Sequence, residues 1–193
     1  MAPLDENLPV PERPRRRFAG IALLLLPAMF LAPGIPASAD EPLEYQVKAA
    51  FLLNFTKFVE WPATAFPEQN SPLTICIVGA DPFGNTLNEM VKGEAVNGHP
   101  IVIEKVAGTL TTAKSCQVLF VKKSEKDTSR IVAVSGPGVL TVGEGEDFIR
   151  DGGIVAFVVD NRRVRFDIDQ RAAAKAMLTI SSRLMNVARY VER

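Results

Sequence analysis

Hydrophobic and polar positions form blocks along the chain that predict strands and helices in alternation. Predominantly apolar runs, typical of strands buried on both faces of a sheet, occur at 73–78, 101–103, 116–121, 139–142 and 154–159. The stretches between these runs predict four helices. The first is capped by Asp81 and ends at about residue 92, and the others lie at 110–114, at about 125–131 and near 147–150. This alternation indicates βαβ units and a largely parallel sheet that is covered on both faces.

The pattern changes in the last quarter of the chain. Residues 164–168 alternate between apolar and polar side chains directly after the Asp160-Asn161 turn, which predicts a strand antiparallel to the preceding one. Residues 170–191 then carry apolar side chains at helical spacing. They predict one long helix, capped by Asp169.

A first helix is predicted from about Leu43 to Glu60, and Pro62 ends it. Its apolar side chains are spread over more than one face, so one stripe against a core cannot contain them all. Two interpretations remain open: the helix is buried on most sides, or part of its aromatic surface meets a partner. The polar residues Gln46, Lys48 and Asn54 argue against a membrane span.

Residues 1–39 have the features of a cleavable export signal. An arginine cluster at 13–17 precedes an uncharged apolar run from Phe18 to Leu31, and Ala37-Ser38-Ala39 supplies a peptidase site. The apolar run would span ~21 Å as a helix, less than the ~30 Å of a bilayer core, which argues against a permanent anchor. We therefore expect cleavage after Ala39, a periplasmic location, and a single mature domain over 40–193.

Charge and side-chain chemistry argue against several functions. The chain has 22 basic and 22 acidic residues, so it lacks the positive excess expected of a nucleic-acid-binding protein. His99 is the only histidine, interpreted as a solvated loop residue, and no Gly-x-Ser-x-Gly motif occurs. The sequence therefore predicts no enzyme, no metal site and no cofactor.

Two cysteines remain in the mature chain, Cys76 and Cys116. An exported domain meets an oxidising compartment, where two thiols in a small domain usually pair. A disulfide between them is favoured, and two buried thiols acting as small apolar residues are the alternative.

Several short motifs follow one another along the chain. They are residues 45–55 (YQVKAAFLLNF), 58–62 (FVEWP), 75–79 (ICIVG), 81–84 (DPFG), 96–98 (VNG), 100–101 (PI), 116–121 (CQVLFV), 152–157 (GGIVAF), 164–168 (VRFDI) and 180–184 (ISSRL). With these motifs the chain resembles the YfiR family of periplasmic proteins. Each motif alone is weak, but together they cover nearly all of residues 44–190 in the right order.

The resemblance implies an α/β fold: a three-layer Rossmann-like sandwich with a mostly parallel sheet of about six strands and an antiparallel closing pair. It also implies a repressor that binds the periplasmic sensor part of an inner-membrane diguanylate cyclase and thereby affects cyclic-di-GMP signalling. The resemblance further implies an outer-membrane lipoprotein that relieves the repression, as in the best-known relative. Because relatives regulate different membrane sensors, a sensor kinase is the alternative partner. Cys76 and Cys116 match one family cysteine pair, whereas a second family pair has no counterpart here.

Binding to such a partner requires an apolar patch with aromatic or arginine anchors. The candidates are Phe157, Arg165, Phe166 and Arg183, near the closing hairpin and the last helix, although packing or solvation explains each equally well. A homodimer through the apolar first helix is a further possibility. The alternative function is a periplasmic domain that binds a small ligand at the carboxyl ends of the strands.

Overall fold

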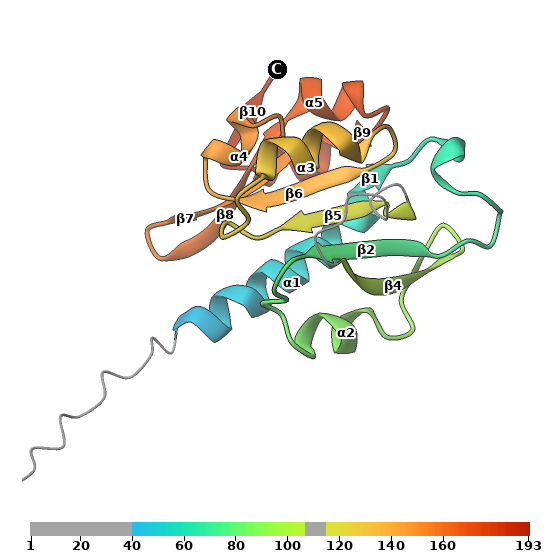
Figure 1. Ribbon diagram of the computed structural model, residues 1–193, viewed down its shortest axis with the longest axis horizontal. Helices are drawn as coiled ribbons and strands as arrows, with labels where there is room; N and C mark the ends of the chain where they lie inside the picture. Colours follow the sequence, from blue (N-terminus) through green and yellow to red (C-terminus); the bar gives the residue numbers. More distant parts are fainter. Residues whose placement is uncertain (1–39, 107–114) are drawn as a thin grey trace, which may run out of the picture. The chain divides into compact units, whose positions relative to one another are not determined.

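An eight-stranded mixed sheet forms the centre of the molecule (Figure 1). The structure is a computed structural model that describes residues 40–106 and 115–193, so the expected leader and the helix expected at 110–114 lie outside the described residues. The strand order is β10-β8-β7-β6-β5-β2-β4-β3. The strands are β2 (Leu73–Val78), β3 (Ala95–Val96), β4 (His99–Val106), β5 (Val118–Val121), β6 (Leu140–Glu144), β7 (Val155–Asp160), β8 (Arg163–Asp169) and β10 (Tyr190–Glu192).

The sheet confirms the predicted topology and extends it at both edges. Strands β4, β2, β5, β6 and β7 are mutually parallel, and β8 pairs antiparallel with β7 as the closing hairpin. The two strands that were not expected are short edge strands: β3 is antiparallel to β4, and β10 is parallel to β8. A separate two-stranded sheet pairs β1 (Val59–Glu60) with β9 (Thr179–Ile180).

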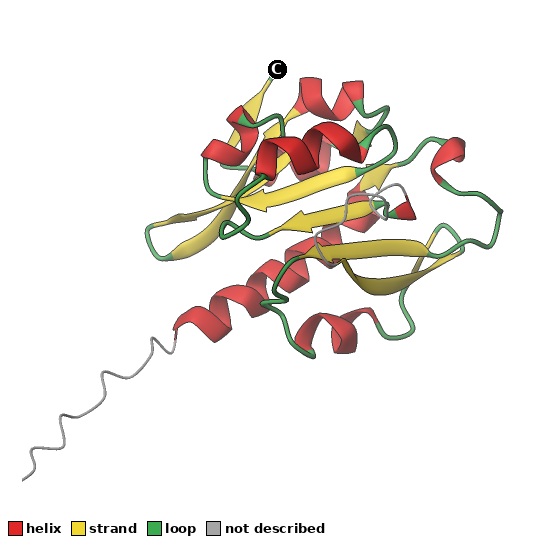
Figure 2. Cartoon of the chain, viewed as in Figure 1, coloured by secondary structure: helices red, strands yellow, loops and turns green. Residues whose placement is uncertain are grey.

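Alternating side chains of the central strands enter two different cores. Ile75 and Phe120 contribute to one core, whereas Cys76 and Leu119 contribute to the other. Helices cover both faces (Figure 2), which gives the three layers of a Rossmann-like sandwich. The helices are α1 (Asp40–Phe58), the 3-10 turn η1 (Ala63–Ala65), α2 (Thr86–Val91), α3 (Thr128–Ser135), α4 (Asp147–Arg150), α5 (Gln170–Lys175) and α6 (Ser182–Val187).

Helix α1 is held against the sheet mainly by aromatic packing. Phe55 is fully buried, and its ring centroid lies 5.7 Å from that of Phe157 and 5.1 Å from that of Phe166. The helix also packs on α2 and α6, so burial on several sides explains most of its apolar surface. Its first turns are the exception, because Leu43 is 59% exposed and Val47 is 36% exposed.

The prediction of a single long helix over 170–191 is wrong. Helix α5 ends at Lys175, because Met177 takes a left-handed backbone conformation (φ 58°). The amide of Leu178 donates to the Ala173 carbonyl and that of Met177 to the Ala174 carbonyl, which is a Schellman helix ending. Asp169 does cap α5, as expected, by accepting hydrogen bonds from the Arg171 and Ala172 amides.

The chain beyond α5 returns to the sheets instead of continuing as a helix. Ser181 caps the short helix α6 by accepting from the Arg183 amide, and β10 then pairs with β8. Arg189 secures this end: its Nε donates to Asp167 Oδ1 at 2.9 Å, and its Nη2 donates to Glu146 Oε1 at 2.7 Å. These hydrogen bonds raise the pKa of the Arg189 guanidinium above its ordinary value.

The disulfide favoured by the sequence is present in the structure. Cys76 on β2 and Cys116, just before β5, are bonded, with their Cα atoms 5.8 Å apart, and both are buried on the face that α3 covers. The bond joins positions separated by 40 residues.

We predict that the Cys76→Ala/Cys116→Ala variant loses about 4 kcal/mol of unfolding free energy, because the unfolded chain regains the freedom of the open loop. Urea denaturation with and without reductant measures this loss. Reductant should destabilise the wild type to a similar extent and leave the variant unchanged. Equal stability of the oxidised and reduced wild type would contradict the prediction.

Phe148, on α4, packs its ring between two glycines, Gly143 on β6 and Gly153 before β7. A Cβ atom added to either glycine would overlap this ring. Gly143 has no positive φ, so an alanine there tests packing and not backbone strain.

We predict that Gly143→Ala lowers the unfolding free energy by about 1–3 kcal/mol through overpacking. Thermal and urea denaturation provide the measurement. Phe148→Leu should cost less in the Gly143→Ala background than in the wild type, since the smaller side chain relieves the overlap. Additive effects of the two changes would contradict the packing account.

Candidate binding site at the carboxyl ends of the strands

The carboxyl ends of the parallel strands meet at one edge of the sheet, where α/β proteins commonly bind ligands. The chain runs from β2 through α2 to β4 on one side, and β5 then lies on the other side of β2. The topological switch point is therefore between β2 and β5.

Side chains of this protein fill the crevice at that switch point. The Phe83 ring lies 5.7 Å from Tyr45 and 4.8 Å from Phe120, measured between centroids. The Glu125 carboxylate occupies the position that a Cβ on Gly79 would take. Open space is found beside the crevice, along the ends of β5, β6 and β7.

The loop after β2 differs from the sequence prediction. Asp81 does not cap α2, because this helix begins at Thr86, with Asn85 at its N-cap position. Asp81 Oδ1 instead accepts from the Phe83 amide at 2.8 Å, and Oδ2 lies 2.9 Å from Lys105 Nζ. The carboxylate thus fixes the turn that places Phe83 in the crevice.

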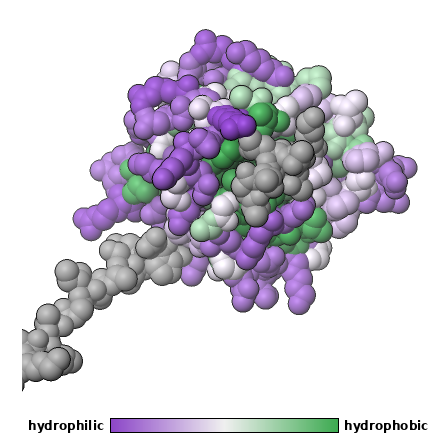
Figure 3. All heavy atoms as spheres, viewed as in Figure 1, coloured by the Kyte–Doolittle hydropathy of each residue, from purple (hydrophilic) through white to green (hydrophobic). Residues whose placement is uncertain are grey.

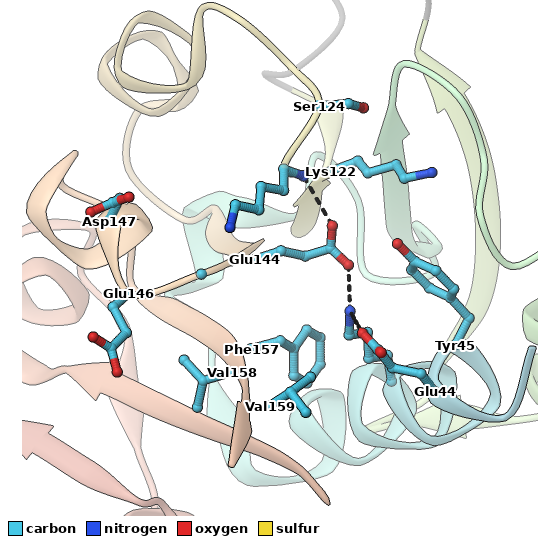
Figure 4. A pocket seen from close by; sticks show the side chains of 13 residues that line it. Glu44, Tyr45, Lys122, Ser124, Glu144, Glu146, Asp147, Phe157, Val158 and Val159 are labelled. Atoms are coloured by element: carbon cyan, nitrogen blue, oxygen red, sulfur yellow. Dashed lines mark hydrogen bonds and ion pairs between the residues drawn. The ribbon is translucent and has the colours of Figure 1, made fainter. Parts of the chain in front are cut away.

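A pocket of about 700 Å³ lies at the ends of β5 and β6 (Figure 4). Phe157, Val158 and Val159 of β7 form one wall, with Glu44 and Tyr45 of α1 on one side and Glu146 and Asp147 on the other. The complete lining is Glu44, Tyr45, Lys48, Lys122, Lys123, Ser124, Glu144, Gly145, Glu146, Asp147, Phe157, Val158 and Val159.

A buried ion pair joins α1 to the end of β6 in this pocket. Lys48 Nζ lies 2.5 Å from Glu144 Oε1 and 2.5 Å from Glu44 Oε1, and the Lys48 and Glu144 side chains are 5% and 8% exposed. The other oxygen of Glu144 accepts a hydrogen bond of 2.9 Å from the Lys123 amide. Glu144 therefore holds both α1 and the loop after β5 in place.

The remaining carboxylates of the pocket also have cationic partners. Glu146 pairs with Arg189 at 2.7 Å, and Asp147 pairs with Arg150 on α4. Lys122 and Lys123 differ, since neither ammonium group forms an ion pair within the described part of the chain. Lys122 Nζ lies 5.6 Å from the centre of the Tyr45 ring.

The lining of this pocket includes neither a histidine nor a cysteine. His99 is at the other end of β4, where it stacks on Phe66 with centroids 3.8 Å apart and its Nδ1 is 2.7 Å from the Ser71 carbonyl oxygen. It is thus a half-buried packing residue, not the solvated loop residue expected. Within residues 40–106 and 115–193, no group of three or more His, Cys, Asp or Glu residues could hold a metal ion.

The four predicted partner-binding residues are divided between the core and the surface. Phe157 and Phe166 are each 1% exposed and pack on α1, so a partner cannot reach their rings in this conformation. Arg165 on β8 and Arg183 on α6 are exposed. The two phenylalanines are therefore packing residues of the core, which is the alternative role that the sequence analysis gave them.

Exposed apolar side chains on α1 form a second hollow. It measures about 320 Å³ and is lined by Leu43, Gln46, Val47, Ala50, Phe51 and Asn54. Hydrophilic residues predominate at the margin of the face shown in Figure 3. None of the helices in the described ranges is both long enough and apolar enough to cross a membrane.

The fold and the site define a class: a three-layer α/β domain with a pocket of charged and apolar side chains at the carboxyl ends of its parallel strands. The model of the YfiR/HmsC-like family matches residues 45–189. The chain belongs to this family, which is a regulatory family associated with cyclic-di-GMP signalling in the periplasm.

A solved structure supports the fold assignment. The crystal structure of a conserved domain protein from Vibrio cholerae O1 biovar El Tor is similar to this chain, with a TM-score of 0.53 and 12% sequence identity. The similarity covers 77% of this chain and 60% of the other, so the chain spans less than two thirds of that protein. No curated protein matches the chain in sequence.

We predict that Lys48→Met costs about 3–5 kcal/mol of unfolding free energy, because Glu144 stays buried without its cation. Urea denaturation measures the loss. The Lys48→Met/Glu144→Gln variant should recover part of it, since glutamine can still accept from the Lys123 amide and carries no charge. A double variant less stable than Lys48→Met would contradict this account of the pair.

Proposed function

We propose that this protein is a periplasmic regulator that binds the periplasmic sensor part of an inner-membrane diguanylate cyclase and represses its activity. The observation that carries the proposal is the YfiR/HmsC-like family match over residues 45–189. This family regulates cyclic-di-GMP signalling. The sequence resemblance implies that the regulator represses the diguanylate cyclase, the enzyme that synthesises cyclic-di-GMP.

Three features of the chain are consistent with this role. Residues 1–39 have the composition of an export signal, which would deliver the domain to the compartment that the sensor part faces. The Cys76–Cys116 disulfide suits an oxidising compartment. The pocket at the ends of β5 and β6 gives the domain a hollow that a bound molecule could occupy.

The proposed contacts with the sensor part are Arg165 and Arg183. Both are exposed, and neither forms an ion pair within the described residues, so their guanidinium groups are free to pair with carboxylates of a partner. Phe157 and Phe166 support the contact indirectly, by packing β7 and β8 on α1. An outer-membrane lipoprotein that relieves the repression would complete the system.

We predict that deleting the gene in its host raises cellular cyclic-di-GMP several-fold, because the cyclase loses its repressor. Complementation with the wild type should restore the low level. Complementation with Arg165→Ala/Arg183→Ala should not, whereas Arg130→Ala, which removes an exposed arginine from α3, should restore it. Mass spectrometry of cyclic-di-GMP in extracts provides the readout.

The location and the partner are tested with the same strains. The periplasmic protein should begin at Asp40, and the tagged protein should retain a diguanylate cyclase from solubilised membranes. An unchanged cyclic-di-GMP level after both deletion and overexpression would contradict the proposal. If the tagged protein retains a sensor kinase and no cyclase, the kinase is its partner and the proposed cyclase is not.

A further inference from the structure

We infer that the end of the β7–β8 hairpin, residues 158–165, is a docking element in which Arg162 and Arg163 act together with Arg165. This segment is called the hairpin tip. The partner surface that fits it is a groove of the sensor part with one acidic wall and one apolar wall. The inference rests on the proposed function and adds the chemistry of the partner to it.

The hairpin tip extends beyond the strands on either side of it. β6 pairs with β7 only as far as Phe157, and β7 continues to Asp160. β10 pairs with β8 only from Asp167 onward, and β8 begins at Arg163. Figure 1 shows the turn projecting past the end of β6. No strand of the described chain flanks the tip, so a partner can reach it from both edges.

Arg162 occupies a backbone position that ordinarily belongs to glycine. Asp160 pairs with Arg163, so the loop between them has two residues, and both have positive φ (Asn161 48°, Arg162 60°). Loops of this kind prefer asparagine followed by glycine. Asn161 fits the preference, whereas Arg162 keeps a long charged side chain although its backbone is strained. Strained positions cluster at functional sites, which singles out Arg162 as a binding residue.

The hairpin tip carries a net positive charge. Arg162, Arg163 and Arg165 are exposed, and none of them forms an ion pair within residues 40–106 and 115–193. Asp160 is the only acidic residue of the tip, and its carboxylate accepts a hydrogen bond of 3.1 Å from the Asn161 side chain. Three arginines against one aspartate give the tip a net charge of +2.

The neighbouring pocket at the ends of β5 and β6 does not neutralise this charge. Its four carboxylates, together with Asp167, make five negative charges. They are balanced by five cations, which are Lys48, Lys122, Lys123, Arg150 and Arg189. The charges around the pocket therefore cancel, and the hairpin tip keeps its surplus of two positive charges.

The two faces of the hairpin tip differ in chemistry. Val159 and Val164 are cross-strand partners, so their side chains lie on the same face. Val159 is 57% exposed and Val164 is half-buried, which leaves apolar surface in contact with water. Arg163 and Arg165 alternate with Val164 along β8 and therefore lie on the opposite face. A groove that encloses the tip meets carboxylate-binding groups on one side and apolar groups on the other.

A protein groove fits the hairpin tip better than a lipid surface does. Two net charges and two valines would hold the protein to a bilayer only weakly, since stable attachment takes a larger basic patch or an acyl chain. Guanidinium groups, in contrast, pair with carboxylates through two parallel hydrogen bonds, and a hairpin holds them in a fixed arrangement. The tip is thus suited to specific recognition of an acidic protein surface.

The test measures binding of the protein purified from the periplasm to the full-length cyclase in lipid nanodiscs, by biolayer interferometry. Empty nanodiscs of the same lipids are the control for membrane binding. The wild type should bind the loaded discs and not the empty ones, with an affinity that falls as salt increases.

Matched variants assign the contact to the hairpin tip. Arg162→Gly/Arg163→Gln should weaken binding at least tenfold and melt at the temperature of the wild type or above it, because glycine relieves the strain in the turn. Val159→Thr, which keeps a β-branched side chain, should weaken binding severalfold. Arg130→Gln, which changes an exposed arginine of α3, should leave it unchanged.

The outcomes separate this inference from the proposed function. Binding by the double variant that is as tight as that of the wild type would overturn the inference and leave the proposed function intact. Equal binding of the wild type to loaded and empty nanodiscs would assign the tip to lipid and overturn the inference as well. No binding of the wild type to the loaded discs would overturn both.

Discussion

The burial of α1 against the sheet is the interaction on which the rest of the structure depends. The central parallel strands are apolar on both faces, so each face must be covered. On one face this is done by α1, which precedes every strand of the sheet in sequence, and Phe55 packs on both Phe157 and Phe166 to close the core. Because these contacts join the start of the chain to the closing hairpin, they bring the first turns of α1 beside the ends of β5 and β6.

The candidate sites follow from this placement. Once α1 is in position, Lys48 reaches Glu144, and Tyr45 closes the switch-point crevice together with Phe83. The pocket therefore lies beside the crevice, on the side of β7. There Lys122 and Lys123 share its lining with Val158 and Val159. The exposed arginines of β8 and α6 lie on other elements, so changing them leaves the lining of the pocket intact.

Much of the fold could be predicted from the sequence, because continuous apolar runs and turn residues report local structure directly. The parallel strands, the closing hairpin and the Asp169 cap were predicted in this way. The break in the last helix was not, since Met177 adopts a left-handed conformation that its side chain does not signal. The pocket was not predicted either: Lys48 and Glu144 are 96 positions apart, and a single sequence contains no sign of such a pair. In the sequence, Lys122 and Lys123 belong to an ordinary polar stretch. Only the structure shows that they line the pocket and have no ion-pair partner among the described residues.

The central claim is that this protein acts by binding a membrane cyclase and not by catalysis. The most direct test is the rate of cyclic-di-GMP synthesis by the purified full-length cyclase in lipid nanodiscs while the periplasmic protein is titrated in. The account predicts a rate that falls with added protein and reaches a plateau at a fixed stoichiometry. A rate that stays constant over the whole titration, with both proteins folded, would contradict it.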